Sequence, residues 1–192
     1  MTNRLCNKWN YLFILCMLKI KNAIIVVKII KNWPVIFMDY FNLIKKPYLI
    51  KFRNGVKYKV RPKTFDKYII SEIWCHKGYI QIGFQIKDSD LILDIGAHIG
   101  VFSIFASRQV KNGKIYAFEP APENFEMLRE NIELNKAKNI IPFNKAVSDK
   151  NGKREIYFSS NPADTGGHSF VFASKNKIIV ETISLGGLHF KK

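Results

Sequence analysis

The amino-acid sequence predicts an α/β fold with a parallel sheet, and two segments carry that prediction. Residues 91–100 read Leu-Ile-Leu-Asp-Ile-Gly-Ala-His-Ile-Gly, an apolar strand that ends in an acid and is followed by glycines opening a helix. Residues 114–120 form a second strand-like run that also ends in an acid, Glu119. Glu119 follows Asp94 by 25 residues, a spacing that places the two strands side by side.

The two acids and the glycines predict a nucleotide-type cofactor site at the carboxyl edge of this sheet. Gly96 and Gly100 let backbone amides approach a ligand closely, and the helix expected over about 99–110 points its positive end at the same spot. Glu119 is placed to accept hydrogen bonds from both hydroxyls of a ribose. The alternative is a strand, turn and helix of any doubly wound fold, with no nucleotide bound.

The spacing of the glycines separates two classes of nucleotide cofactor. NAD-binding loops read G-x-G-x-x-G, and the middle glycine admits the pyrophosphate. This chain reads G-x-x-x-G from Gly96 to Gly100. S-adenosylmethionine (SAM) has no phosphate and fits the looser loop, so the sequence predicts a Rossmann-like sheet that binds SAM.

The other elements follow from local signals. Two alternating stretches around Asn54-Gly55 predict a β-hairpin over 48–61, with both residues of the dipeptide suited to the positive φ of a tight turn. Thr64 is expected to cap a helix over 65–76, and Pro122 to open a helix over 122–135. Further strand-like segments are 79–84, which is ambiguous, 140–144, 145–148 and 153–159, expected to pair around Asn151-Gly152, and 177–185.

The charge is concentrated in the N-terminal third. The whole chain carries a net charge of +16, and residues 1–63 hold 14 Lys and Arg against one acid, Asp39. An amphipathic basic helix is expected before Pro34, and a short one over 35–43. This element either packs on the domain or contacts a membrane surface through residues 1–44; the lysines interrupt it too often for a membrane span. A lysine-rich genome is an equally good source of the charge.

The cysteines and histidines set further bounds. Cys6, Cys16 and Cys75 form an odd, widely spaced set, which disfavours a disulfide framework and fits a reducing cytoplasm. The four histidines show no ligand-like spacing, so no metal site is expected. The expected location is cytoplasmic, with peripheral membrane contact as an alternative.

A set of motifs in one order resembles the FkbM-type SAM-dependent methyltransferases over about residues 48–185. The motifs are Phe52-Arg-Asn-Gly-Val-Lys-Tyr-Lys-Val-Arg-Pro, Asp66, Glu72-Ile-Trp, Tyr79, Asp94-Ile-Gly-Ala-His-Ile-Gly-Val-Phe-Ser, Phe118-Glu-Pro and Asn144-Lys-Ala-Val-Ser-Asp149. The resemblance implies methylation of hydroxyl oxygens on sugars, glycans or natural products, with a small-molecule or glycan acceptor. No nucleic-acid partner is expected, because residues 1–63 have aromatic residues among their lysines but no known nucleic-acid-binding motif.

The resemblance also implies a set of cofactor-binding residues. Asp94, Gly96 and Gly100 line the methionine end, Glu119 holds the ribose, and Ser148 with Asp149 lies near the adenine. His98 stands where the family more often has Asn, and a role for it as a catalytic base is disfavoured by its place inside the cofactor loop. No catalytic residue is assigned. The implied cofactor-binding set is Glu72, Tyr79, Asp94, Gly96, Ala97, His98, Gly100, Glu119, Ser148 and Asp149.

The end of the chain departs from the family pattern. After Leu185 the family continues into a fourth core strand, whereas this chain reads Gly-Gly-Leu-His-Phe-Lys-Lys and stops at residue 192. The sequence therefore predicts an incomplete sheet and little activity for this chain alone. Two other hypotheses remain, a non-catalytic SAM-binding remnant and a basic membrane-surface module. The expected division is 1–47 (basic helical extension), 48–90 (hairpin and helix) and 91–192 (partial SAM-binding domain).

Overall fold

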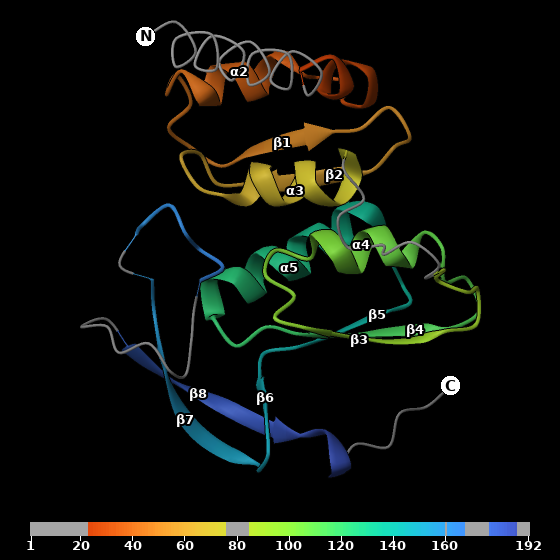
Figure 1. The fold of residues 1–192 in the computed structure, drawn as a ribbon, viewed down its shortest axis with the longest axis vertical. Coiled ribbons are helices and arrows are strands. Elements are labelled where there is room, and N and C mark those ends of the chain that lie inside the picture. The colour runs from red at the N-terminus through yellow and green to blue at the C-terminus, as the bar shows by residue number, and fades with distance from the viewer. Residues whose placement is uncertain (1–22, 76–84, 160, 168–176, 188–192) are drawn as a thin grey trace, which may run out of the picture.

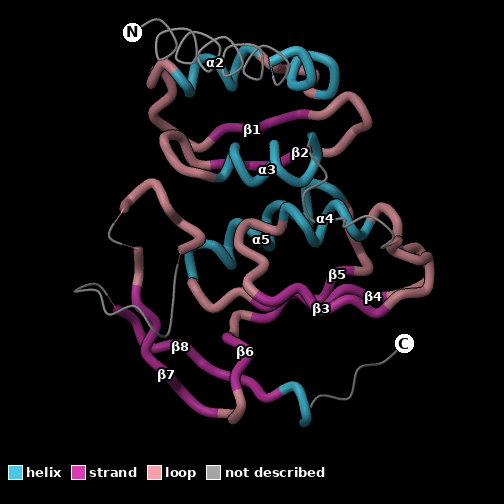
Figure 2. Tube along the Cα trace, viewed as in Figure 1, coloured by secondary structure: helices cyan, strands magenta, loops and turns pink. Residues whose placement is uncertain are grey.

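The computed structural model describes residues 23–75, 85–159, 161–167 and 177–187. From one end of the molecule to the other it shows a short helix, a β-hairpin, a layer of helices, a parallel three-stranded sheet and a second small sheet (Figure 1). Figure 2 shows the same order by type of secondary structure, with helices α3, α4 and α5 between the hairpin and the parallel sheet. The expected strand at 79–84 lies outside the described residues.

The hairpin forms where the sequence predicts it, but its turn is wider than expected. Strands β1 (Tyr48–Lys51) and β2 (Lys57–Val60) pair antiparallel, with Tyr48 opposite Val60. The amide of Phe52 donates to the carbonyl of Val56 at 2.8 Å, so the loop spans three residues. Only Gly55 takes a positive φ, of 90°, and Asn54 does not. The prediction that both would do so was wrong, because a three-residue loop needs only its last residue in the left-handed region.

The N-terminal extension packs on the hairpin. Residues 23–29 are helical, and Ile30 bridges Phe52 of the hairpin. Asn32 donates through its amide to the carbonyl of Leu49 and accepts from the amide of Lys51, which ties the chain to the edge of β1. Helix α2 (Pro34–Tyr40) then begins at the proline. The interpretation that this element packs on the domain is therefore correct for residues 23–32.

No helix within the described residues is both long enough and apolar enough to cross a bilayer.

Helix α3 (Asp66–Cys75) joins the hairpin to the rest of the core. The hydroxyl of Thr64 accepts from the amide of Asp66 at 3.3 Å, as a capping residue does. At the other end, Trp74 donates to the hydroxyl of Tyr58, and that hydroxyl donates to the carbonyl of Val101. Both expected segments, 48–90 and 91–192, contribute to the same hydrophobic cluster, in which side chains such as Tyr58 are fully buried.

The parallel sheet positions the candidate site. Strands β3 (Leu91–Ile95), β4 (Lys114–Phe118) and β5 (Ile140–Phe143) pair in parallel in that order. Helices α4 (Val101–Ser107) and α5 (Pro122–Asn135) connect them and lie on the same side of the sheet (Figure 1). These elements confirm the predicted α/β fold, although α4 is shorter than the predicted span of 99–110. It starts later because Gly100, with a left-handed φ of 84°, occupies its N-cap position.

Two asparagines attach α5 to the outer edge of the hairpin. Asn131 accepts from the amide of Lys59 at 2.7 Å and donates to its carbonyl at 3.2 Å. One helical turn later, Asn135 makes the same pair of bonds with Lys57. The open backbone groups of β2 are thus satisfied by side chains instead of by another strand.

The second sheet corrects the predicted pairing. Strands β6 (Ala146–Ser148) and β7 (Gly152–Tyr157) do not pair with each other, because β8 (Lys177–Ser184) lies between them. Thr182 of β8 is opposite Ala146 on one side and Gly152 on the other. With eight residues, β8 bonds the full lengths of both neighbours, and a short helical turn, Leu185–Gly187, follows it.

Candidate functional site

Two buried acids lie at the carboxyl ends of neighbouring strands. Asp94 is the fourth residue of β3, opposite Ala117 of β4, and Glu119 follows directly after β4. Their residues are 9% and 4% exposed. Burial raises the pKa of both carboxyls, because a charged group loses its hydration there. The sequence prediction that these two acids share one edge is confirmed.

Donors are supplied to Asp94 by helix α4. The hydroxyl of Ser103, a buried residue of α4, donates a short hydrogen bond to Oδ2 of Asp94. Burial has the largest effect on the pKa of Asp94, and the Ser103 bonds lower it in part. Sequence reasoning missed Ser103, which the helical turn after Gly100 brings back over the end of β3.

Glu119 holds the loop that follows β3. Its Oε2 accepts from the amide of His98 at 2.8 Å, and its Oε1 accepts from the amide of Ala121 at 2.9 Å. The side-chain amide of Asn124 lies 3.5 Å from the same Oε1. These donors lower the pKa of Glu119, but burial outweighs them and leaves the pKa above its ordinary value. Glu119 therefore has a structural role in the loop besides the predicted one toward a ribose.

The glycine loop is built on positive φ angles. Gly96, His98 and Gly100 have φ values of 78°, 52° and 84°. The amides of Gly96 and Ala97 both donate to the carbonyl of Phe118, 2.9 Å away, so the loop is bound to the end of β4. The predicted close approach of backbone amides to a ligand at Gly96 and Gly100 stays a prediction.

The two glycines differ in what surrounds them. A Cβ at Gly100 would lie 2.5 Å from Cδ1 of Leu128, so this glycine allows α5 to pack closely. At Gly96, no heavy atom among the described residues lies within 4 Å of the position a Cβ would take. Gly96 therefore faces open space at the mouth of the site, where a ligand can approach the backbone.

A cavity of about 430 Å³ opens at the end of β3. Its walls come from the carboxyl end of β3, the glycine loop, helices α3 and α4, and the segment 164–167. The predicted residues Asp94, Gly96, Ala97 and His98 all line it. Its remaining walls are largely apolar, among them Ile69, Ile73, Val101 and Phe102.

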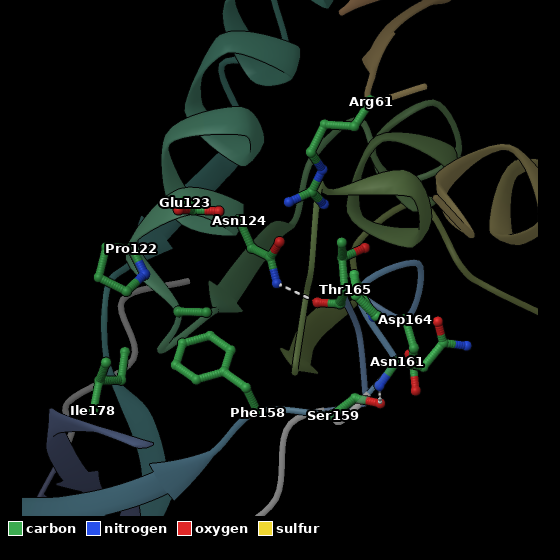
Figure 3. Close-up of a pocket in the computed structure, with 12 residues that line it drawn as sticks. Arg61, Pro122, Glu123, Asn124, Phe158, Ser159, Asn161, Asp164, Thr165 and Ile178 are labelled. Atoms are coloured by element: carbon green, nitrogen blue, oxygen red, sulfur yellow. Dashed lines mark hydrogen bonds between the residues drawn. The ribbon is translucent and has the colours of Figure 1, made fainter. Parts of the chain in front are cut away.

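A second cavity, of about 520 Å³, lies on the other side of the segment 161–167 (Figure 3). Figure 3 shows Asn124 of α5 pointing toward Thr165, and Arg61 and Phe158, which directly follow β2 and β7, also line the cavity. Asn124 donates to the carbonyl of Thr165 at 2.8 Å. Ala121, whose amide donates to Glu119, lines this second cavity, whereas Glu119 itself lines neither cavity.

A buried charged cluster connects the glycine loop to the hairpin. Arg61 donates from Nε and Nη2 to the two oxygens of Asp66, each at 3.0 Å. The Nε2 atom of His98 lies 3.2 Å from Nη2 of Arg61 and 2.9 Å from Oγ1 of Thr165. The Thr165 hydroxyl donates to Asp66 at 3.0 Å. Burial alone would raise the pKa of Asp66, but the bonds and charge of Arg61 prevail and lower it.

This cluster engages the imidazole of His98 in structural contacts. The prediction that His98 is a tolerated loop residue, with a role as catalytic base disfavoured, stays a prediction. Arg61 and Thr165 were missed as site residues, because Asp66 and Thr165 are 99 positions apart and only the fold brings them together. Asp66 stood in the motif that carries the resemblance, which was a signal for this cluster.

Other predicted residues lie away from these cavities. Glu72 is exposed on α3, and neither cavity includes it. Ser148 and Asp149 belong to the second sheet region, where the Ser148 hydroxyl donates to Asp149 and accepts from Arg154. Neither residue lines either cavity. Tyr79 lies outside the described residues. The cofactor roles of these four residues stay predictions.

Comparisons with known proteins show the family to which the chain belongs. A family model described as the TRM5/TYW2 methyltransferase domain matches residues 50–159, more than half of the chain. The 31-O-demethyl-FK506 methyltransferase FkbM of Streptomyces tacrolimicus is 30% identical over 121 residues, covering 63% of this chain and 46% of that protein. This match confirms the resemblance predicted from the motifs.

Two further proteins are similar over shorter spans. The tRNA(Phe) (4-demethylwyosine(37)-C(7)) aminocarboxypropyltransferase of Methanocaldococcus jannaschii is 32% identical over 77 residues, covering 38% of this chain and 31% of that protein. The crystal structure of M. jannaschii TYW2 in complex with AdoMet shows 25% identity and a TM-score of 0.39, covering 52% of this chain and 43% of that chain. The chain spans less than half the length of these curated relatives.

Proposed function

We propose that this chain, which belongs to the TRM5/TYW2 methyltransferase domain family, transfers a methyl group from S-adenosylmethionine to a hydroxyl oxygen of a sugar, glycan or natural product. The observation that supports this most is the pair of buried acids, Asp94 and Glu119, on either side of a glycine loop. SAM is the cofactor of this site. The open backbone at Gly96 and the cavity beside it fit a ligand that carries no phosphate.

Different residues of the site bind different parts of the cofactor. Asp94 lies at the mouth of the cavity with Gly96 and Ala97, and we assign these three to the methionine end. Glu119 keeps lone pairs beyond those used by His98 and Ala121, and we assign it to the ribose hydroxyls. Because Glu119 binds both the loop amide and the ribose, cofactor binding and loop geometry are coupled through one carboxylate.

Bound SAM supplies a methyl group on a positively charged sulfur. Transfer of this methyl group to an acceptor hydroxyl would form a C–O bond as the C–S bond breaks, and the hydroxyl proton would pass to a base or to water. The apolar walls of the cavity at Ile69, Val101 and Phe102 exclude water from the reacting atoms. The protein contributes mainly by positioning the two reactants.

The hydroxyl acceptor is the finer part of this proposal. It is supported by the family resemblance of the motifs and by the similarity to a methyltransferase whose name specifies an O-demethyl substrate. A tritiated-methyl transfer assay tests it, with sugar, glycolipid and tRNA acceptors offered in parallel. Label in the carbohydrate fractions supports the proposal, and label in tRNA instead overturns the choice of acceptor.

Calorimetry tests the site itself. We expect binding of SAM or S-adenosylhomocysteine in preference to NAD, and Glu119→Ala is expected to weaken binding by about 1–3 kcal/mol through loss of charge-assisted hydrogen bonds. Glu133→Ala, on the exposed side of α5, is the matched control and should bind like the unchanged chain. Thermal unfolding of both variants separates lost affinity from lost folding. Equal affinity of the folded Glu119→Ala variant contradicts the assignment of Glu119.

A further inference from the structure

A group of large apolar side chains is exposed at the N-terminal end of the molecule. Tyr40, Phe41 and Leu43 expose 65–67% of their surface, and Phe37 and Met38 are also exposed. We call these five residues the α2 patch. Single exposed apolar residues are ordinary, but five within seven positions form a continuous feature that indicates an interaction surface.

The α2 patch is presented by a helix whose polarity is reversed. Asp39, the only acid of α2, is 1% exposed, while its neighbours Met38 and Tyr40 face solvent. The buried carboxylate accepts from Nζ of Lys67 at 2.5 Å and from the hydroxyl of Tyr48 at 3.1 Å. A surface helix normally turns its acid outward and its apolar residues inward. Here Asp39 fixes α2 to the domain through its buried contacts. Because Asp39 faces inward, Tyr40 and Phe41 remain exposed to solvent.

The stretch of chain that carries the patch is basic. Asp39 is the only Asp or Glu in residues 23–63, and it is buried. Exposed basic side chains in this stretch are Lys28, Lys31, Lys45, Lys46, Lys51, Arg53, Lys57 and Lys63. Lys45 and Lys46 come two and three residues after Leu43. A lysine-rich genome accounts for many lysines, but not for an exposed apolar cluster in a stretch without an exposed acid.

We propose that the α2 patch binds the surface of an anionic membrane. Tyr40, Phe41 and Leu43 enter the boundary between headgroups and acyl chains, and the neighbouring lysines lie at the level of the lipid phosphates. Apolar burial and attraction to anionic lipid together give interfacial binding, and either alone is weak. Lysine stems lie along the apolar boundary while their charges stay in water. This proposal is independent of the methyltransferase function.

The composition of the patch favours lipid over RNA. A single-stranded nucleic acid is bound by aromatic rings that stack on bases within a basic groove. Met38 and Leu43 have no ring to stack, yet they are exposed beside the aromatic residues. Both find apolar surroundings in a lipid interface.

Flotation of the full chain with vesicles tests the proposal. Vesicles of phosphatidylcholine containing about one third phosphatidylserine are expected to carry the chain, and pure phosphatidylcholine vesicles are not. Binding is expected to fall at least about tenfold in roughly 0.5 M salt, since the lysine contribution is screened. Equal binding to both kinds of vesicle contradicts the electrostatic part of the proposal.

Matched variants separate the two contributions. Phe41→Ser is expected to weaken vesicle binding about tenfold, and the triple change Tyr40→Ser, Phe41→Ser and Leu43→Ser to abolish it. Ile179→Ser is the control, because Ile179 is equally exposed, at 66%, on β8 of the second sheet. Lys45→Glu with Lys46→Glu is expected to prevent binding, while Lys150→Glu with Lys153→Glu changes the net charge equally but lies outside the patch.

Several results would overturn the proposal. The patch is not a lipid site if the folded triple variant floats like the unchanged chain. It is an RNA surface if the lysine variant loses binding to tRNA in a gel-shift assay and no form of the chain floats. The patch is an interface between two copies of the chain if light scattering shows that the unchanged chain is a dimer and the triple variant is a monomer, and if neither of them floats with vesicles. Circular dichroism verifies that each variant is folded.

Discussion

The parallel sheet β3-β4-β5 and the second sheet β6-β8-β7 bury very different amounts of apolar surface. The first shares one large cluster with the hairpin and helices, in which Ile104, Ile115 and Leu128 are fully buried. Within the described part of the chain, the second sheet buries a cluster of three hydrophobic residues, Ala146, Ile156 and Val180. The free energy of folding is therefore concentrated in the part of the chain that carries the candidate cofactor site.

The charged residues of the two regions differ in the same way. Asp94 and Glu119 are buried, and among the described residues no lysine or arginine forms an ion pair with them; hydroxyl and amide donors form hydrogen bonds with them instead. In the second sheet, Glu155 pairs with Lys177 at 2.8 Å in the solvent. A buried acid lowers the stability of the folded chain, but it binds a ligand more strongly than an exposed acid does. An exposed ion pair contributes little to stability or to ligand binding. The site is thus maintained by the large core around it.

The largest expected effect on stability comes from shortening a buried side chain in each of the two sheet regions. Leu128→Ala should destabilise the chain by about 2–5 kcal/mol, because Leu128 is surrounded by packed side chains and leaves a cavity. Ile156→Ala removes a similar volume from the small cluster, which can collapse toward solvent, and should cost about half as much. Urea unfolding measures both. Equal losses would show that the second sheet is packed as firmly as the first.

The two loop glycines sharpen the comparison within the site. Gly100→Ala should cost about 2–4 kcal/mol, since it combines a left-handed φ with a contact 2.5 Å from Leu128. Gly96→Ala has the same backbone cost but no neighbour to displace, and should cost only about 1–2 kcal/mol.

The double variant Gly100→Ala with Leu128→Ala serves as the control for this explanation. Removing Cδ1 of Leu128 makes room for the new Cβ, so the combined loss of stability should be smaller than the sum of the two. Additive losses would mean that backbone strain alone explains the requirement for Gly100. Thermal unfolding of the four chains completes the cycle.

Much of the region 91–135 could be predicted from the sequence because its signals are local. A strand ending in an acid, a glycine opening a helix and Pro122 at a helix start each act within a few residues, and α5 has the predicted bounds. The pairing of β6 and β7 could not be predicted the same way. It depends on β8, which lies between them in space but more than 25 residues after β6 in the chain.

The site divides along the same line. Asp94, Glu119 and the glycines were found because each lies at the end of a strand or in the loop that follows it. Arg61 follows the hairpin, and Thr165 lies in a loop far along the chain. No periodic pattern in the sequence predicts that both contact His98. The role of Gly100 in admitting Leu128 was also missed, because it needs the distance between two helices.

The acids of the two regions should respond to pH in opposite directions. Burial raises the pKa of Asp94, so the folded chain binds this proton more tightly than the unfolded chain. Its contribution to stability is present below the ordinary pKa and is lost as the pH rises through the folded pKa. The hydrogen bond from Lys177 lowers the pKa of Glu155, so its contribution is present above the ordinary pKa and is lost as the pH falls through the folded value.

Asp94→Asn has the smallest expected effect on stability, and it tests the cost of burying the Asp94 carboxylate. The variant keeps an oxygen for the Ser103 hydroxyl but carries no charge, so it should be more stable than the unchanged chain at neutral pH. That difference should shrink as the pH falls, because Asp94 then becomes protonated and resembles asparagine. SAM affinity should fall about tenfold at neutral pH with the loss of a charge-assisted bond. Glu155→Gln is the control: it should leave SAM affinity unchanged, and it should remove only the loss of stability at acid pH that the Lys177 bond gives to Glu155. A variant that loses stability and affinity together at every pH would show that the Asp94 carboxylate supports the fold, and the cost assigned to the buried acid would be wrong.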